Sequence, residues 1–201
     1  MKKESTEQRL ERIHEAAVTL ASRRSVDSIS IYDVAKEASI AASTVYHHYP
    51  NIESLICELM KGIFDDFIHV LEDSIVEDQI HHWSDINRMI EQGFVDYYRK
   101  SPLAQHTLLG QHTYASVRTE DARNDLLLGL KVEQIYRRYF VLPELPKDVN
   151  IFAIALQVAD KVYSLNFRQI GEIEPEMARE AQVITEAYIG AYLPKILPKV
   201  N

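Results

Sequence analysis

Residues 42–49 read Ala-Ser-Thr-Val-Tyr-His-His-Tyr, and Pro50 follows them directly. This stretch predicts a short helix in which Val45 points inward between small and polar residues. Pro50 ends the helix, because the residue before a proline is pushed out of the helical conformation. A short helix with small residues at its start and polar or aromatic side chains outward is suited to enter the major groove of DNA.

Two further helices are predicted upstream of this stretch. Ser30 and Asp33 have the spacing of a capping box, which predicts a short helix over residues 31–38. Apolar residues with a helical period predict a longer helix over residues 6–24. Two helices of about eight residues do not fold alone, so the longer helix must close their core. Three helices arranged in this way are typical of a helix-turn-helix.

The rest of the chain repeats this helical pattern. The whole chain holds only 6 Gly, and few segments alternate apolar and polar residues with period two. We therefore predict an all-α fold of about nine helices with no confident strand. A long helix is predicted after Asn51 towards residue 78, and a second one from Ser84 to about 100. Another is entered through Ser101-Pro102, and the next opens at Thr119 or Glu120 and runs through Leu126, Leu130, Ile135 and Phe140. Two last helices are predicted at 148–170 and 175–193.

The charge balance limits the class of protein. The 201 residues include 22 Lys and Arg against 30 Asp and Glu, a formal charge of −8. Residues 1–60 hold seven basic and nine acidic side chains. This balance argues against a protein that coats nucleic acid through bulk charge, and it leaves room for a small local contact surface. Cys57 is the only cysteine, and no run resembles a membrane helix or a signal peptide, so we expect a cytoplasmic protein without a membrane partner.

Residues 13–59 closely resemble the N-terminal domain of the TetR family of transcriptional regulators. The residues that carry the resemblance are Ile13-His14-Glu15-Ala16-Ala17-Val18-Thr19-Leu20, Ser30 to Ala38, and Ser43 to Leu55. The resemblance implies a homodimeric repressor that binds a palindromic DNA operator and is released by a small, largely apolar effector. It also implies a helix-turn-helix DNA-binding domain over residues 1–50 and a ligand-binding and dimerisation domain over residues 51–201.

The resemblance assigns the DNA-binding positions residue by residue. Ser30 matches the hydroxyl that caps the second helix near a phosphate. The remaining positions lie in the turn and the recognition helix, and they are Ala42, Ser43, Thr44, Tyr46, His47 and His48. Hydroxyl and imidazole groups there would contact phosphates, which fix the register, and base edges, which supply specificity.

The sequence also departs from the family pattern. Family members often have Gly where Ser25 and Ser39 stand, and serine adopts a left-handed conformation only at some cost, so we expect these turns to be built differently. Lys is common where Ala42 and Ile52 stand, so two phosphate contacts are missing. A flexible N-terminal arm could compensate through Lys2, Lys3 and Arg9.

The C-terminal half is expected to hold a dimer interface and a ligand pocket. In the resembled family, the last two helices of each subunit form a four-helix interface; the residues alone suit equally a role in closing one subunit's core. Aromatic and polar residues crowd the middle helices, which would suit a mostly apolar effector with one polar end. The candidate ligand-binding residues are Phe94, Tyr97, Tyr98, His106, Tyr136, Phe140, Tyr163 and Phe167.

The sequence gives weaker support to three other classes of function. The sequence has no Gly-rich phosphate loop, no G-x-S-x-G and no H-E-x-x-H, so we expect no enzyme, no cofactor and no metal. Glu11-x-x-His14, Asp66-x-x-His69 and Asp78-x-x-His81 only partly match the paired motifs of di-iron bundles. A metal-sensing regulator would use His69, His81, His82, His106 and His112. The third alternative is a helical ligand-binding or partner-binding protein that does not touch DNA.

Overall fold

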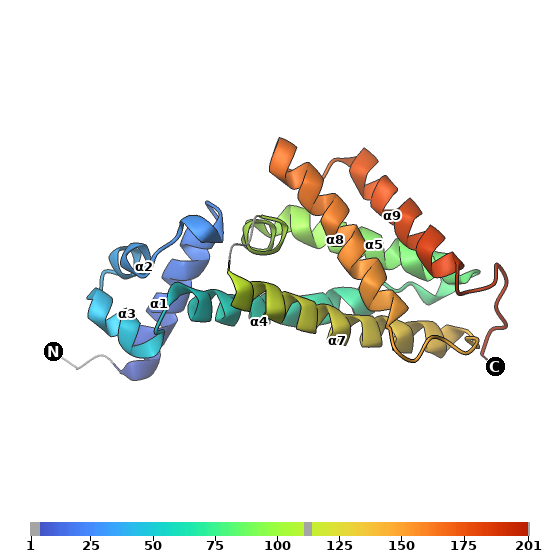
Figure 1. The fold of residues 1–201 in the computed structure, drawn as a ribbon, viewed down its shortest axis with the longest axis horizontal. Helices are drawn as coiled ribbons and strands as arrows, with labels where there is room; N and C mark the ends of the chain where they lie inside the picture. The colour runs from blue at the N-terminus through green and yellow to red at the C-terminus, as the bar shows by residue number, and fades with distance from the viewer. Residues whose placement is uncertain (1–4, 111–113, 201) are drawn as a thin grey trace. The chain divides into compact units, whose positions relative to one another are not determined.

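The computed structural model describes residues 5–110 and 114–200, and within these ranges the chain is all-α (Figure 1). It forms nine α-helices, joined in places by short 3₁₀ or π turns: α1 (Thr6–Ala21), α2 (Ile31–Glu37), α3 (Ala42–His48), α4 (Ile52–Asp73), α5 (Trp83–Lys100), α6 (Pro102–Ala104), α7 (Ala115–Tyr139), α8 (Ile151–Ile170) and α9 (Pro175–Gly190). The described residues contain no strand beyond one isolated bridge between Phe140 and Lys199. The predicted all-α fold is confirmed.

Local caps explain where several helices begin. Ser5 and Gln8 form a capping box, so α1 begins at Thr6. Arg9 therefore belongs to a helix and not to a flexible arm; Lys2 and Lys3 lie outside the described residues. The predicted cap at Asn51 is confirmed, because its side-chain oxygen accepts a 2.9 Å hydrogen bond from the amide of Ser54.

Two predicted helix starts are wrong. Ser84 lies inside α5, because the carboxylate of Asp85 accepts the amides of His81 and His82 at 2.9 and 2.7 Å and the helix begins at Trp83. The helix predicted to open at Thr119 or Glu120 begins at Ala115. The Thr119 hydroxyl donates to the Ala115 carbonyl at 2.9 Å, so it is a group within the helix and not a cap.

The chain divides into two compact units. The first comprises residues 1–63 and 101–121, and the second comprises residues 64–100 and 122–201. The helix-turn-helix lies within the first unit. That unit also includes residues 51–63 and 101–121, which a boundary at residue 50 would place in the second domain.

Apolar faces of α1 to α4 form the core of the first unit. Val45 is the only fully enclosed side chain of α3, as its sequence predicts. α2 packs against both α1 and α3, so the two brief helices share one core with α1. The core includes Ile13, Ala16, Ala17, Ala21, Val26, Ile31, Val34, Ala35, Leu55 and Ile56.

The second unit is a helical bundle in which α8 lies along α9 (Figure 1). α7 and α8 approach closely at Gly129, where an added Cβ would lie only 2.5 Å from the backbone nitrogen of Ala153. A glycine is required at that position because any side chain would force the two helices apart. Among the described residues, no helix is both long and apolar enough to cross a membrane.

Candidate nucleic-acid interface and ligand pocket

The recognition helix α3 presents a polar outer face. Ser43, Tyr46 and His47 are exposed, while Ala42 and Thr44 are half-buried. Val45 anchors the helix from the opposite face. The helix carries no Lys, Arg, Asp or Glu, so its contacts to a partner would come from hydroxyl, imidazole and aromatic groups.

A capping box holds the start of α2. The Ser30 hydroxyl accepts the Asp33 amide at 3.2 Å, and the Ser30 amide donates to the Asp33 carboxylate at 2.9 Å. The hydrogen bonds from Ser30, with a smaller contribution from Arg24 at 3.3 Å, hold the pKa of Asp33 below its ordinary value. The cap predicted at Ser30 is confirmed; its contact with a phosphate stays a prediction.

The turn between α2 and α3 depends on a strained serine. Ser39 has a φ of +54°, in the left-handed region, which an L-residue adopts at a cost. The Arg12 guanidinium of α1 donates to the carbonyls of Ala38 and Ser39, the latter at 3.1 Å. These hydrogen bonds hold the turn against α1. Ser25, by contrast, has a φ of −52° and needs no left-handed conformation. The expectation of a differently built turn is therefore right at Ser25 and wrong at Ser39.

The two adjacent histidines face different surroundings. His47 is exposed, whereas His48 is half-buried and its Nε2 atom is buried without a hydrogen-bond partner among the described residues. Their rings meet edge-to-face at 5.1 Å. His47 is thus open to an outside partner, whereas His48 is only partly accessible, and the DNA contacts predicted for both stay predictions.

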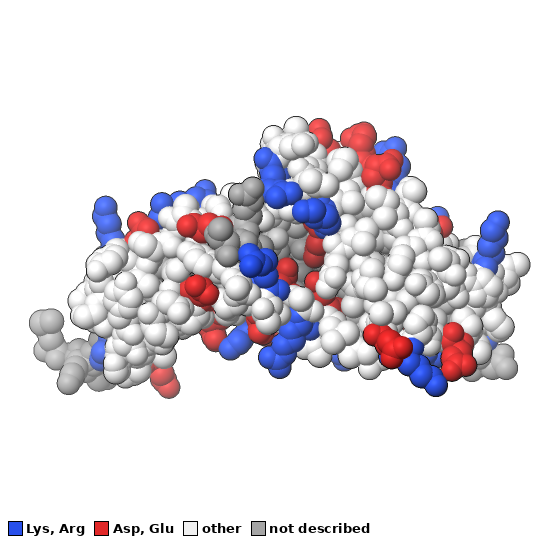
Figure 2. All heavy atoms as spheres, in the orientation of Figure 1, with Lys and Arg blue, Asp and Glu red and all other residues white. Residues whose placement is uncertain are grey.

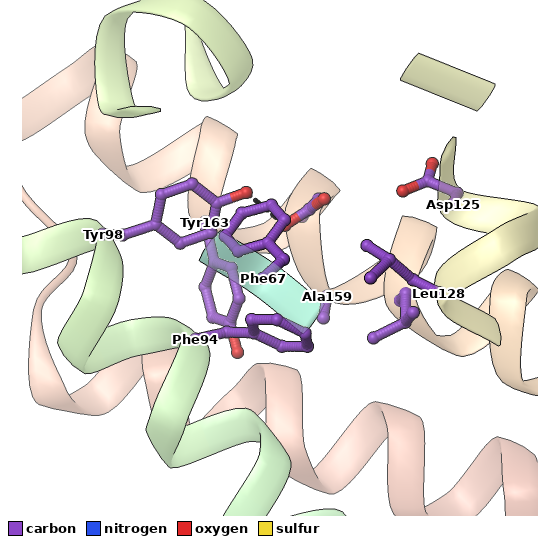
Figure 3. Close-up of a pocket in the computed structure, with 9 residues that line it drawn as sticks. Phe67, Phe94, Tyr98, Asp125, Leu128, Ala159 and Tyr163 are labelled. Atoms are coloured by element: carbon purple, nitrogen blue, oxygen red, sulfur yellow. Dashed lines mark hydrogen bonds between the residues drawn. The ribbon is translucent and has the colours of Figure 1, made fainter. Parts of the chain in front are cut away.

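The second unit contains a small pocket between α4, α5, α7 and α8 (Figure 3). Its open space is about 10 Å³, which is room for a single water molecule. Four aromatic rings form one side, two carboxylates reach the space, and aliphatic side chains complete the lining: Phe67, Phe94, Tyr98 and Tyr163; Asp125 and Asp160; Leu128, Leu156 and Ala159.

The predicted ligand-binding residues fall into separate places. Phe94, Tyr98 and Tyr163 line this pocket. The other five do not. Tyr97 donates to Asp66 at 2.7 Å, Tyr136 packs against Phe152 at 4.7 Å, and Phe140 and Phe167 are buried. His106 belongs to the first unit, where burial lowers its pKa.

A buried carboxylic acid lies beside the pocket. Glu91 of α5 is 4 % exposed, and it accepts the hydroxyl hydrogen of Tyr163 of α8. Burial raises the pKa of Glu91 to about 7, and the hydrogen bond from Tyr163 opposes only part of that rise. Nearby, Asn87 of α5 donates to Thr185 of α9 at 3.1 Å. These polar contacts link α5 to both C-terminal helices.

No metal site was found in the part of the chain that the structure describes. There, no three His, Cys, Asp or Glu side chains come close enough to hold an ion. His112, one of the five histidines considered for metal sensing, lies outside the described residues.

Comparison with known proteins bears on the N-terminal helices. The sequence profile described as "Bacterial regulatory proteins, tetR family" matches residues 13–59, which span most of α1, all of α2 and α3, and the start of α4. The N-terminal domain of this chain belongs to the TetR family.

A curated repressor is similar to part of this chain. The HTH-type transcriptional repressor KstR2 of Rhodococcus jostii is 34 % identical over 50 residues, which are 25 % of this chain and 24 % of that repressor. The match therefore spans about a quarter of the curated relative's length.

Two solved structures share the fold of most of the chain. A TetR-family transcriptional regulator from Streptomyces coelicolor has a TM-score of 0.70 at 20 % identity, covering 92 % of this chain and 99 % of that one. The fatty acid degradation regulator FadR from Bacillus halodurans has a TM-score of 0.57 at 15 % identity, covering 94 % of this chain and 97 % of that one. At these identities the likeness establishes the fold.

Sequence reasoning missed one exposed aromatic residue of the TetR-family domain. Tyr32 of α2 is 68 % exposed, and its ring lies 6.1 Å from that of Tyr46 in an edge-to-face contact. The two tyrosines present a continuous surface from α2 to α3. The signal was present in the sequence, because Tyr32 falls off the inward spacing of Ile31, Val34 and Ala35 in the same helix.

Charged side chains are few over α2 and α3 of the TetR-family domain. On the face drawn in Figure 2, uncharged atoms predominate over α2 and α3. Residues 1–60 carry two more acidic than basic side chains. Any binding of DNA would therefore depend on specific hydrogen bonds and shape more than on bulk attraction, with a shallow dependence on salt.

Proposed function

We propose that this chain is a transcriptional repressor that binds a palindromic DNA operator as a homodimer and is released by a small, largely apolar effector. One observation carries the proposal: a family-matched helix-turn-helix presents Ser43, Tyr46 and His47 outward from a helix without acidic residues. An outer face of this kind suits a phosphate-lined groove, because no carboxylate of α3 would repel the backbone.

Each exposed group would have its own part in the DNA contact. The hydroxyls of Thr44 and Tyr46 donate to phosphate oxygens, and the imidazole of His47 reaches a base edge or a neighbouring phosphate. The small side chains of Ala42 and Ser43 permit close approach of the backbone. Ser30 keeps α2 in place through its cap, and the accessible part of His48 adds a second imidazole to the contact.

The outward face of α9 supports a dimer. Val183 and Ile184 are 55 % and 41 % exposed, and the rings of Tyr188 and Tyr192 follow on the next turns. Leu165 of α8 is exposed as well. Pairing these faces between two copies would remove apolar surface from water and place two recognition helices on one duplex.

Release by an effector would follow from a shift between two states. The two states differ in the spacing of the recognition helices. A ligand in the pocket of the second unit binds one state more tightly than the other, and this difference in affinity sets the size of the shift. The polar contacts of Glu91 and Asn87 connect α5 with α8 and α9, so a displacement of α5 at the pocket has a direct route to the proposed dimer helices.

Selection of binding sites from a random duplex pool tests the DNA-binding function. The purified protein is used at low salt, and Tyr46→Ala is carried in parallel, with exposed Glu15→Ala of α1 as the control. We expect the wild type and the control to recover the same palindrome and Tyr46→Ala to recover it weakly. Failure of the wild type to enrich any site would overturn the proposal.

A further inference from the structure

We propose that the pocket between α4, α5, α7 and α8 binds the protonated head group of a primary amine that carries an apolar tail. The inference rests on the proposed function and deepens it by naming the class of effector. The binding step stands apart from DNA binding and can be measured without DNA.

The size of the pocket favours a small head group. Its open space of about 10 Å³ corresponds to one water molecule, and an –NH₃⁺ group is of similar size. A bulky quaternary ammonium or a fused ring system would require the surrounding rings to move. Leu128, Leu156 and Ala159 supply the aliphatic part of the lining, against which the first carbons of a tail would pack.

The aromatic rings favour a cation. The ring centroid of Phe67 lies 5.0 Å from that of Phe94 and 5.5 Å from that of Tyr98. The centroids of Tyr98 and Tyr163 are 6.1 Å apart, and all three pairs are edge-to-face. All four of these rings line the pocket. The negative face of an aromatic ring attracts a cation most strongly where water is excluded.

The two carboxylates determine the sign of the charge. Asp125 of α7 is 6 % exposed and lines the pocket, and in Figure 3 its carboxylate is directed toward the rings. Asp160 of α8 accepts the Tyr98 hydroxyl hydrogen at 3.0 Å and lines the same space. None of the residues that line the pocket in the described structure is Lys or Arg. An ammonium would form charge-assisted hydrogen bonds here, whereas the carboxylate of a fatty acid would be repelled.

A series of eight-carbon ligands tests this inference on the unaltered protein. Octylamine, 1-octanol and octanoate share one tail and differ in head-group charge at pH 7. Isothermal titration calorimetry should show saturable binding of octylamine, at least about tenfold weaker binding of octanol, and the weakest binding for octanoate. The inference is overturned if octanol or octanoate binds as tightly as octylamine, or if octylamine does not bind.

Paired variants locate the site. Asp125→Asn and Asp160→Asn should each weaken octylamine about 10- to 100-fold and leave octanol unchanged. Asp65→Asn, which removes one exposed carboxylate of α4, should change neither. If Asp65→Asn weakens octylamine as much as the two pocket variants do, the amine binds the acidic surface and the inference fails. A pocket variant that does not fold leaves the ligand series on the wild type as the decisive test.

Addition of octylamine to the DNA complex separates the two proposals. Octylamine that binds the free protein but does not release DNA would refute the effector role and leave the amine site in place. Release of DNA by octanoate in preference to octylamine would preserve the effector mechanism and refute the amine class.

Discussion

Replacing Glu91 by glutamine should remove a pH-dependent loss of stability. Glu91 is enclosed between α5, α8 and α9, and burial raises its pKa from 4.5 to about 7. The folded protein thus holds the proton more tightly than the unfolded chain does. Stability from this group is fully present below about pH 4.5 and is lost as the pH rises through 7. The glutamine introduced by Glu91→Gln would keep an acceptor for the Tyr163 hydroxyl and carry no charge.

The size of the effect follows from the two pKa values. Raising the pKa from 4.5 to about 7 corresponds to about 3 kcal/mol in the free energy of unfolding between pH 4.5 and pH 8. A difference of this size is a large fraction of the stability of an ordinary domain. The Glu91→Gln variant should therefore gain about 3 kcal/mol relative to the wild type across that range.

Urea denaturation at a series of pH values measures this gain. Protein concentration is held fixed, because association of subunits would itself stabilise the folded state. Glu180→Gln, at an exposed position of α9, is the matched control and should parallel the wild type. Curves for Glu91→Gln and wild type that stay parallel from pH 4.5 to pH 8 would refute the reasoning.

Four further substitutions test the packing of the two units and the proposed dimer interface. Ser39→Gly should raise the free energy of unfolding by about 0.5–1 kcal/mol, because Gly adopts the φ of +54° without strain; a loss of stability in thermal melts would contradict this. Gly129→Ala should cost about 1–3 kcal/mol, since its Cβ would meet the Ala153 backbone, whereas Gly62→Ala, with nothing within 4 Å, should be neutral or stabilising in the same melts. Ile184→Glu should convert the proposed dimer to a monomer in sedimentation velocity and lower operator affinity; a variant that stays dimeric would place the interface elsewhere.

The helix-turn-helix could be predicted because its signals are local. Ser30 and Asp33 form their capping box within one turn, and Pro50 ends α3 through its own ring. Helix α3 has one fully buried position, and Val45 occupies it as its sequence predicts. The start of α5 was missed because the Asp85 carboxylate accepts the backbone amide of His82, which precedes the helix. The start of α7 was missed because the Thr119 hydroxyl donates to the Ala115 carbonyl within the same helix and does not cap it.

The pocket was only partly predictable because it depends on tertiary contacts. Phe94 and Tyr98 were among the predicted ligand-binding residues, whereas Phe67, which lines the same pocket, was not. No local sequence pattern marks Asp125 or Asp160 as a pocket residue, because the space they line is formed by residues from four helices. In α7 the three consecutive leucines Leu126, Leu127 and Leu128 could not show which one is buried; in the structure it is Leu128.

The most direct test of the central claim compares two duplexes in a fluorescence anisotropy titration. One carries the selected palindrome, and the other carries the same sequence with one half-site scrambled. The account predicts that the wild type binds the palindrome at least about 1,000-fold more tightly than random duplex, that scrambling one half-site removes most of this preference, and that Tyr46→Ala lowers it as well. Equal affinity of the wild type for both duplexes would contradict a dimer that reads DNA through α3.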